Sequence, residues 1–113
     1  MSGLSSHVLD TATGRPVAGL TLRLEVATEQ GEWRPLAGGV TDADGRVRDL
    51  LQGAPLQAQT YRLVFETAAY FRATQRPSFY PWIEVVFTVA APGTHHHVPL
   101  LLSPFGYSTY RGS

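Results

Sequence analysis

Hydrophobic and polar side chains alternate along Leu20-Thr21-Leu22-Arg23-Leu24-Glu25-Val26. Successive side chains of a β-strand point to opposite faces, so we expect the leucines and Val26 in a core and Thr21, Arg23 and Glu25 in water. Similar stretches rich in Val, Leu, Tyr, Phe and Thr lie along the chain, punctuated by eleven glycines and eight prolines. This texture predicts an all-β sandwich rather than a helical fold.

Turn signals between these stretches delimit the expected elements. Two examples are Thr13-Gly14-Arg15-Pro16 and Asp42-Ala43-Asp44-Gly45, which are rich in turn-forming residues. We expect strands at residues 4–9, 20–27, 33–38, 46–50, 61–66, 83–90, 95–102 and 106–110. A short helix is expected at residues 67–74, because this stretch lacks strict alternation and Pro77 and Pro81 close it off.

Size and charge exclude several classes of protein. With 113 residues, of which 43% are hydrophobic, the chain can bury one core and is too short for two, so we expect a single domain over residues 1–113. Nine basic residues balance nine acidic ones, and the formal charge is zero. No general attraction to nucleic acid or to an anionic membrane is therefore built in, and we expect neither as a partner.

The chain has no cysteine, which excludes disulfides, thiolate nucleophiles and cysteine zinc sites. Its first residues, Met1-Ser2-Gly3-Leu4-Ser5-Ser6-His7, contain neither the basic start nor the apolar run of a secretory signal. No stretch approaches the roughly 20 apolar residues of a membrane span. We therefore expect a cytoplasmic protein.

All four histidines fall near the two ends of the chain: His7 on the first expected strand, and His95, His96 and His97 at the start of the seventh. The period of two places His95 and His97 on one face of their strand and His96 on the other. Imidazole is the side chain best suited to proton transfer near neutral pH. The face that carries His97 is therefore a candidate catalytic surface.

Other interpretations of the histidines stay open at this point. His7 alone could be a structural strand residue, and the triple histidine could be a solvated strand start. His95 and His97 could also bind zinc, with His7 as a third ligand. No carboxylate lies within three residues of His97 to orient it as a metal ligand, so acid–base chemistry is favoured over metal binding.

Further polar residues accompany these strands. Ser108 and Tyr110 share one face of the last expected strand, beside the strand that carries the histidines. Arg46 follows a turn signal and would, by composition, be an ordinary exposed cation. Asp42 and Asp44 are interpreted as turn formers, because short carboxylates hydrogen-bond the local backbone.

One strand near the end of the chain is apolar on both faces, along Val98-Pro99-Leu100-Leu101-Leu102. On this strand Leu101 shares a face with His97 and Pro99. A strand with two apolar faces needs a second cover besides its own core. A subunit interface would supply that cover.

Three separated stretches resemble one known family. They are Leu4-Ser5-Ser6-His7-Val8-Leu9-Asp10-Thr11-Ala12-Thr13-Gly14-Arg15-Pro16, then Thr41-Asp42-Ala43-Asp44-Gly45-Arg46, and the run from His97 to the terminal Tyr110-Arg111-Gly112-Ser113. They resemble the signatures of the transthyretin-like 5-hydroxyisourate hydrolases, and the resemblance spans nearly the whole chain. Transthyretins proper are similar in fold but lack the terminal tetrapeptide and the histidine and arginine positions. The family commonly has His-Tyr-His where this chain has His95-His96-His97, and His96 faces away from His97.

The resemblance implies a fold and an assembly. The fold is a sandwich of two four-stranded sheets with one short helix. The assembly is a homotetramer, a dimer of dimers, with active sites at the interface between dimers. This placement agrees with the outside cover expected for residues 98–102.

The resemblance also implies an activity: hydrolysis of the cyclic amide of 5-hydroxyisourate, the product of urate oxidation, to 2-oxo-4-hydroxy-4-carboxy-5-ureidoimidazoline, with no metal or organic cofactor. The implied catalytic residues are His7, Arg46, His97 and Ser113, and the implied substrate contacts are His7, Arg46, Tyr110 and Ser108. The two histidines would transfer protons, and which is base and which is acid stays open. Arg46 would bind the substrate and stabilise developing negative charge with its forked donors.

Two other function classes stay open beside this one. A transthyretin-type carrier would hold a small aromatic ligand in the same interface channel without chemistry, and His7, Arg46 and His97 together disfavour it. A purely structural interaction module would leave the sequence at the end of the chain unexplained.

Overall fold

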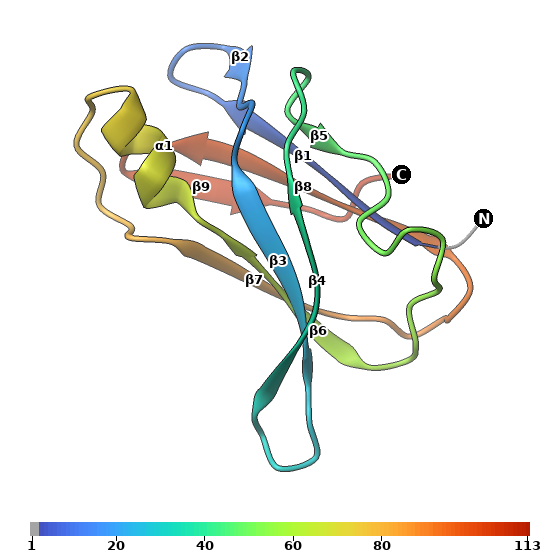
Figure 1. The fold of residues 1–113 in the computed structure, drawn as a ribbon. Coiled ribbons are helices and arrows are strands. Elements are labelled where there is room, and N and C mark those ends of the chain that lie inside the picture. The colour runs from blue at the N-terminus through green and yellow to red at the C-terminus, as the bar shows by residue number, and fades with distance from the viewer. Residues whose placement is uncertain (1–2) are drawn as a thin grey trace.

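The computed structural model describes residues 3–113, so the first two residues of the expected domain lie outside it. The described chain forms a sandwich of two β-sheets with one short helix (Figure 1). The strands are β1 (Gly3–Asp10), β2 (Arg15–Pro16), β3 (Thr21–Ala27), β4 (Trp33–Val40), β5 (Arg46–Val47), β6 (Thr60–Phe65), β7 (Ile83–Thr88), β8 (His95–Ser103) and β9 (Gly106–Thr109), and the helix is α1 (Thr67–Ala73). In the described part of the chain no helix has the length and apolar character needed to cross a membrane.

The two sheets differ in how their strands pair. The first has the order β2-β1-β8-β9, with β5 also beside β1, and the second has the order β4-β3-β6-β7. All of these pairs are antiparallel except β1 with β8, which run parallel from Gly3 opposite His95 to Asp10 opposite Leu102. The parallel pair places the first strand of the chain beside the penultimate one, and this pairing builds the site described below.

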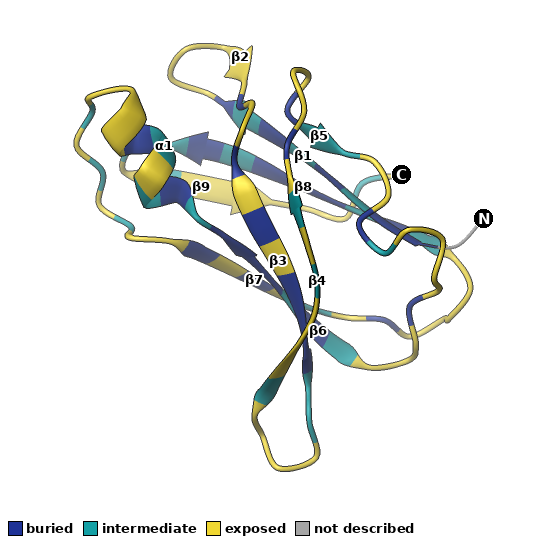
Figure 2. Ribbon diagram, in the orientation of Figure 1, coloured by how far each residue is buried: buried dark blue, intermediate teal, exposed yellow. Residues whose placement is uncertain are grey.

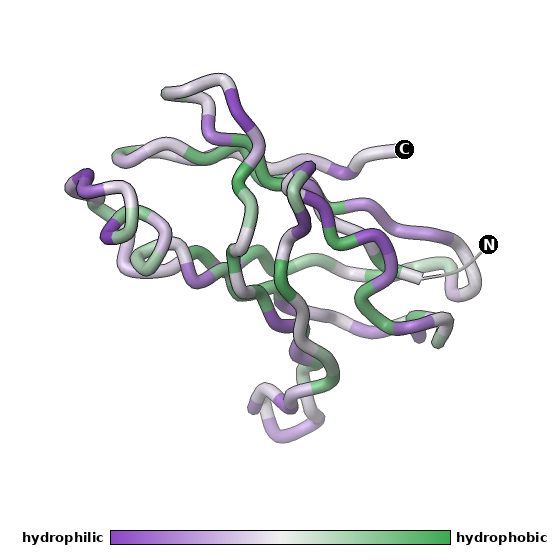
Figure 3. Tube along the Cα trace, turned by 45° about the horizontal axis from the view of Figure 1, so that its top comes forward, coloured by the Kyte–Doolittle hydropathy of each residue, from purple (hydrophilic) through white to green (hydrophobic). Residues whose placement is uncertain are grey.

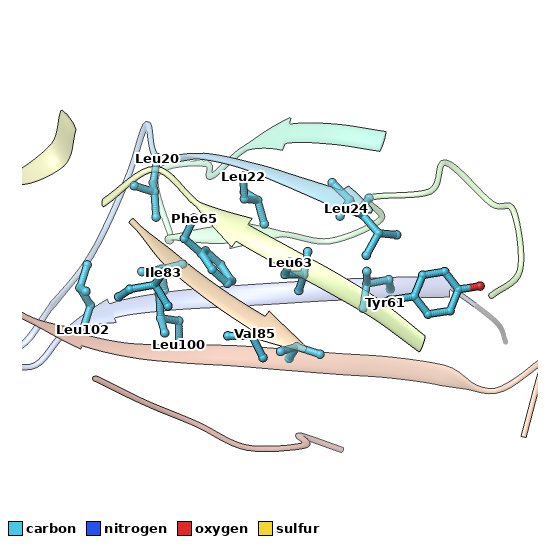
Figure 4. Packing of buried hydrophobic residues seen from close by; sticks show 14 of the residues in the cluster. Leu20, Leu22, Leu24, Tyr61, Leu63, Phe65, Ile83, Val85, Leu100 and Leu102 are labelled. Carbon is cyan, nitrogen blue, oxygen red and sulfur yellow. The ribbon is translucent and has the colours of Figure 1, made fainter. Parts of the chain in front are cut away.

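The core lies between the sheets, where the inward side chains of both meet (Figure 4). Leu22 and Leu24 on β3 and Leu63 on β6 are fully buried, while alternate residues of β3 such as Thr21 and Arg23 are exposed. The alternation of buried and exposed bands is visible along β3 in Figure 2, and the hydrophilic loop between β3 and β4 extends away from the core in Figure 3. The predicted β-sandwich with one short helix is confirmed.

Some expected elements differ in extent. The two-residue strand β2 was not expected, and because it and β5 both pair with β1, the first sheet has five strands instead of four. The strand expected at residues 46–50 is only Arg46–Val47. It ends there because Asp49 begins a turn, in which its backbone carbonyl accepts a hydrogen bond from the Gln52 N–H and its side chain accepts one from the Gly53 N–H.

The expectation that Glu25 faces water was wrong, since the residue is only 8% exposed. Its carboxylate accepts hydrogen bonds from Arg62 Nε at 2.7 Å and Arg23 Nε at 3.3 Å, and the Arg62 guanidinium lies 4.5 Å from the centre of the Trp33 ring. Burial alone would raise the pKa of Glu25, but the two arginines outweigh it and hold that pKa below its usual value. Long side chains thus cover a charged residue on the outer face of the sheet, which alternation does not reveal.

Candidate active site

The candidate site lies on the outer face of the first sheet, where three strands meet. In the parallel pairing of β1 and β8, Ser5 lies opposite His97 and His7 lies opposite Pro99. On the other side of β1, the antiparallel partner of His7 is Arg46 on β5. Residues from the start, the middle and the end of the chain are therefore neighbours on one surface.

The turn before β5 positions Arg46. The Asp42 carboxylate accepts hydrogen bonds from the backbone N–H groups of Asp44 at 2.8 Å and Arg46 at 3.0 Å, which supports its interpretation as a turn former. Gly45 has a φ of +76°, and a Cβ on it would lie 2.5 Å from the carbonyl oxygen of Val8. Only glycine fits this position, because the turn lies directly against the backbone of β1.

The same turn orients His7. Its Nε2–H donates a hydrogen bond to the backbone carbonyl of Asp44 at 2.9 Å. A carbonyl can only accept, so the Nε2 of His7 carries a proton, and Nδ1 is the ring nitrogen left for other partners.

The two neighbouring arginines of this region differ in their partners. Arg48 forms ion pairs with Asp42 at 3.7 Å and Asp44 at 3.3 Å. Arg46 is half-buried and makes no ion pair with any residue among 3–113. Because no carboxylate among residues 3–113 pairs with it, the Arg46 guanidinium is available to bind an electron-rich ligand with two parallel donors.

A surface depression of about 210 Å³ brings several of these residues together, and its lining comprises Ser5, Ser6, Arg46, Val47, Arg48, His97 and Ser113. The end of the chain lies beside β5 (Figure 1) and is held there by a 2.8 Å hydrogen bond from the Gly112 N–H to the His97 carbonyl. A Cβ on Gly112 would overlap the ring of His97. Glycine at this position thus lets the backbone lie flat against the imidazole and places Ser113 in the depression.

Of the four expected substrate contacts, only Arg46 lines this depression within one chain. His7 is the antiparallel partner of Arg46 but is not part of the lining, and neither Ser108 nor Tyr110 belongs to it. Ser108 and Tyr110 are exposed, and Tyr110 lines a separate groove of about 350 Å³ together with His96 and Val98. His96 is buried, and its Nδ1–H donates to the Thr94 carbonyl at 3.1 Å. It therefore faces away from His97, as the period of two predicts.

The electrostatics of the depression favour a neutral His97. Burial is the largest cause, followed by the charges of Arg46, His7 and His95, and together they hold the pKa of His97 below its usual 6.5, while a hydrogen bond with Ser5 opposes the shift. A lowered pKa leaves the imidazole unprotonated at neutral pH, with a lone pair able to accept a proton.

We expect the charge of Arg46 to be measurable in the titration of His97. In Arg46→Gln the NMR titration midpoint of His97 should move upward toward 6.5. The reason is that the positive charge of Arg46, which disfavours the protonated form of His97, is gone. The control is Arg48→Gln, which removes an equal charge that is already paired with Asp42 and Asp44. An unchanged or lowered His97 midpoint in Arg46→Gln would contradict this account of the site.

The family model described as HIUase/Transthyretin family matches residues 4–112. This chain belongs to the HIUase/Transthyretin family. The 5-hydroxyisourate hydrolase of Caulobacter vibrioides is 48% identical over 118 residues, with 100% of both chains covered. The 5-hydroxyisourate hydrolase of Mus musculus is 46% identical over 113 residues, covering 99% of this chain and 96% of the mouse protein.

Solved structures of the HIUase/Transthyretin family are similar in fold. The 5-hydroxyisourate hydrolase of Klebsiella pneumoniae has a TM-score of 0.86 at 40% identity, covering 99% of this chain and 100% of that one. Sea bream transthyretin in complex with thyroxine has a TM-score of 0.89 at 36% identity, covering 96% of this chain and 93% of that one. The fold is thus shared by a 5-hydroxyisourate hydrolase and by a transthyretin in complex with thyroxine, so the function has to be argued from the site.

Four residues that line the depression of this HIUase/Transthyretin site were not among the predicted site residues: Ser5, Ser6, Val47 and Arg48. Ser5 lies in the depression, and its hydroxyl is within hydrogen-bond distance of both His95 and His97. The signal was present, because Ser5 is two residues from His7 and therefore shares its strand face. Among residues 3–113, no three His, Asp or Glu side chains are grouped so as to hold a metal ion.

Proposed function

We propose that this chain hydrolyses the cyclic amide of 5-hydroxyisourate in urate degradation, with His7, Arg46 and His97 as the reacting groups. The observation that carries the proposal is that these three residues come together on one face of a chain 48% identical to a 5-hydroxyisourate hydrolase. Carriage of a ligand without chemistry involves no proton transfer, so these groups favour a hydrolase over a carrier.

The reaction needs two proton transfers and one site of negative charge. Water loses a proton as it attacks the carbonyl, an oxyanion forms, and the ring nitrogen gains a proton as it leaves. His97 suits the base, because its lowered pKa keeps a lone pair on the ring near neutral pH. His7 suits the acid, because the Asp44 carbonyl accepts from Nε2 and a proton on Nδ1 would be free to go to the leaving nitrogen.

Arg46 and Ser113 complete the part of the site that one chain supplies. The unpaired guanidinium of Arg46 would hold the substrate and stabilise the oxyanion with two parallel donors. Ser113 lines the same depression and would add a hydrogen bond to the substrate. In this scheme the reaction uses no metal or organic cofactor.

We further propose that Ser108 and Tyr110 reach the substrate through assembly into a dimer of dimers. Both are exposed in the single chain, and Tyr110 is 58% exposed although it carries a large ring. Leu9 and Leu101 pair on the same outer face and are only partly covered. A second dimer seated on this face would cover the leucines and enclose a depression that is otherwise open and shallow.

The test is to add freshly generated 5-hydroxyisourate to the purified protein and to follow its ultraviolet decay against the spontaneous rate. We expect marked acceleration, unchanged after extensive dialysis against a chelator. No acceleration would overturn the hydrolase assignment, and a ligand carrier would take its place. Activity lost on chelation and restored by zinc alone would replace proton transfer by His7 and His97 with metal catalysis.

A further inference from the structure

One hydroxyl group links two of the histidines. The Oγ of Ser5 lies 2.8 Å from the Nε2 of His95 and 2.8 Å from the Nδ1 of His97. A serine hydroxyl has a single hydrogen, so it can donate to only one of these nitrogens and has to accept from the other. The two imidazoles are therefore coupled, because the tautomer of one determines that of the other.

Two arrangements of protons satisfy both hydrogen bonds when the rings are neutral. In the first, His97 donates from Nδ1 to Ser5, Ser5 donates to Nε2 of His95, and the Nε2 of His97 is a free lone pair. In the second, His95 donates from Nε2 to Ser5, Ser5 donates to Nδ1 of His97, and the Nε2 of His97 carries a proton. Only the first arrangement leaves His97 able to act as a base through Nε2, the nitrogen that has no hydrogen-bond partner among residues 3–113.

The Asp49 carboxylate lies on the same side of Gly3 as the His95 ring but forms no ion pair with it, and its Oδ1 accepts a hydrogen bond from the Gly53 N–H. An ideal Cβ on Gly3 would lie 3.7 Å from the Nδ1 of His95 and 3.8 Å from the Oδ1 of Asp49, so these two atoms flank the same point. The choice between the two arrangements therefore follows from the proposed function, in which Nε2 of His97 accepts the proton of the attacking water. In the first arrangement His95 carries its proton on Nδ1, so its Nε2 accepts the hydrogen bond that Ser5 donates.

We propose that Ser5, with His95 behind it, is a positioning residue that holds His97 in the tautomer with a free Nε2. This inference rests on the proposed function, in which His97 accepts the proton of the attacking water. Gly112 lies against the His97 ring, since any side chain at that position would overlap it.

The same contacts provide a route for the proton that His97 takes up. When Nε2 of His97 accepts a proton from water, the proton on Nδ1 moves to the Oγ of Ser5, and the hydroxyl proton of Ser5 moves to Nε2 of His95. His97 is then neutral with a proton on Nε2, Ser5 is again a neutral hydroxyl, and the positive charge lies on His95. The charge thus moves away from Arg46, whose proximity disfavours a cationic His97.

The tautomer can be determined by NMR of the full-length protein labelled with ¹⁵N in histidine. The ¹⁵N chemical shift of a ring nitrogen depends on whether that nitrogen carries the proton. In the wild-type protein at neutral pH we expect His97 protonated at Nδ1 and unprotonated at Nε2. In Ser5→Ala we expect both tautomers, and in Ser5→Thr, which keeps a hydroxyl on a strand position, we expect the wild-type pattern. A wild-type His97 protonated at Nε2 alone would overturn the proposal. This measurement is made on the wild-type protein and does not depend on whether any variant folds.

Steady-state kinetics provide a second test of the proposal. We expect Ser5→Ala to lower kcat by about 10- to 100-fold, less than loss of the base itself, and Ser5→Thr to recover most of the loss. The matched control is Ser103→Ala, whose hydroxyl donates to the Gly106 carbonyl at the far end of β8 and should leave kcat unchanged. A Ser5→Ala protein with unchanged kcat and an unchanged His97 tautomer would overturn the positioning role of Ser5. The proposed hydrolase function would still stand if the wild-type protein is active. A wild-type protein without activity would instead overturn the proposed function.

Discussion

Replacing His97 by alanine should lower turnover of 5-hydroxyisourate by about 10²–10⁴-fold, the usual contribution of a positioned acid–base group. The fold should survive, because the half-buried ring lies in the surface depression and is not among the side chains of the hydrophobic core. Its backbone pairing with Gly112 does not depend on the side chain. Circular dichroism and steady-state rates decide the outcome, and near-normal activity would remove His97 from the mechanism.

The matched control for this variant is the neighbouring histidine. His96→Tyr should keep nearly full activity, because His96 points to the opposite face of β8 and the groove of about 350 Å³ beside it gives the larger ring room. If His96→Tyr lost as much turnover as His97→Ala, the loss in both variants would be explained by disturbance of β8 and not by removal of the His97 imidazole.

Leu101→Glu should split the proposed tetramer into dimers and abolish most turnover. In the single chain Leu101 is only partly covered, opposite Leu9 on β1 and Ser108 on β9, so a glutamate there is tolerated by the fold. Across an assembled interface the same carboxylate would be buried without a partner, which costs several kcal/mol. The dimer would then be favoured, and sites built from facing dimers would come apart although His7, Arg46 and His97 remain in every chain.

Sedimentation velocity and the rate assay, run on the same preparation, test this coupling. Val40→Glu is the control, since it adds the same charge to β4 of the other sheet, where the side chain is 59% exposed. It should change neither assembly nor turnover. A Leu101→Glu protein that sediments as a dimer with full activity would show that the site is complete without the second dimer.

The strand pattern and the local turn before Arg46 could be predicted from the sequence alone. Alternation along β3 placed Leu22 and Leu24 in the core, and the Asp42 turn before Arg46 was recognisable from its residue types. These features depend on neighbours within a few residues, so periodicity and turn preferences are enough to predict them. The resemblance of the chain ends to one family added the candidate residues His7, Arg46 and His97.

Spatial relations between distant strands were decided only by the tertiary structure. Ser5 meets His95 and His97 across 90 and 92 residues of chain, and alternation shows which face a residue occupies but not which strand lies beside it. The burial of Glu25 escaped prediction for the same reason, since the arginine nearest to it, Arg62, comes from another strand. Local patterns thus determined the sandwich and the faces of its strands, whereas the parallel register of β1 and β8 decided which polar groups meet and which histidine nitrogen is left free.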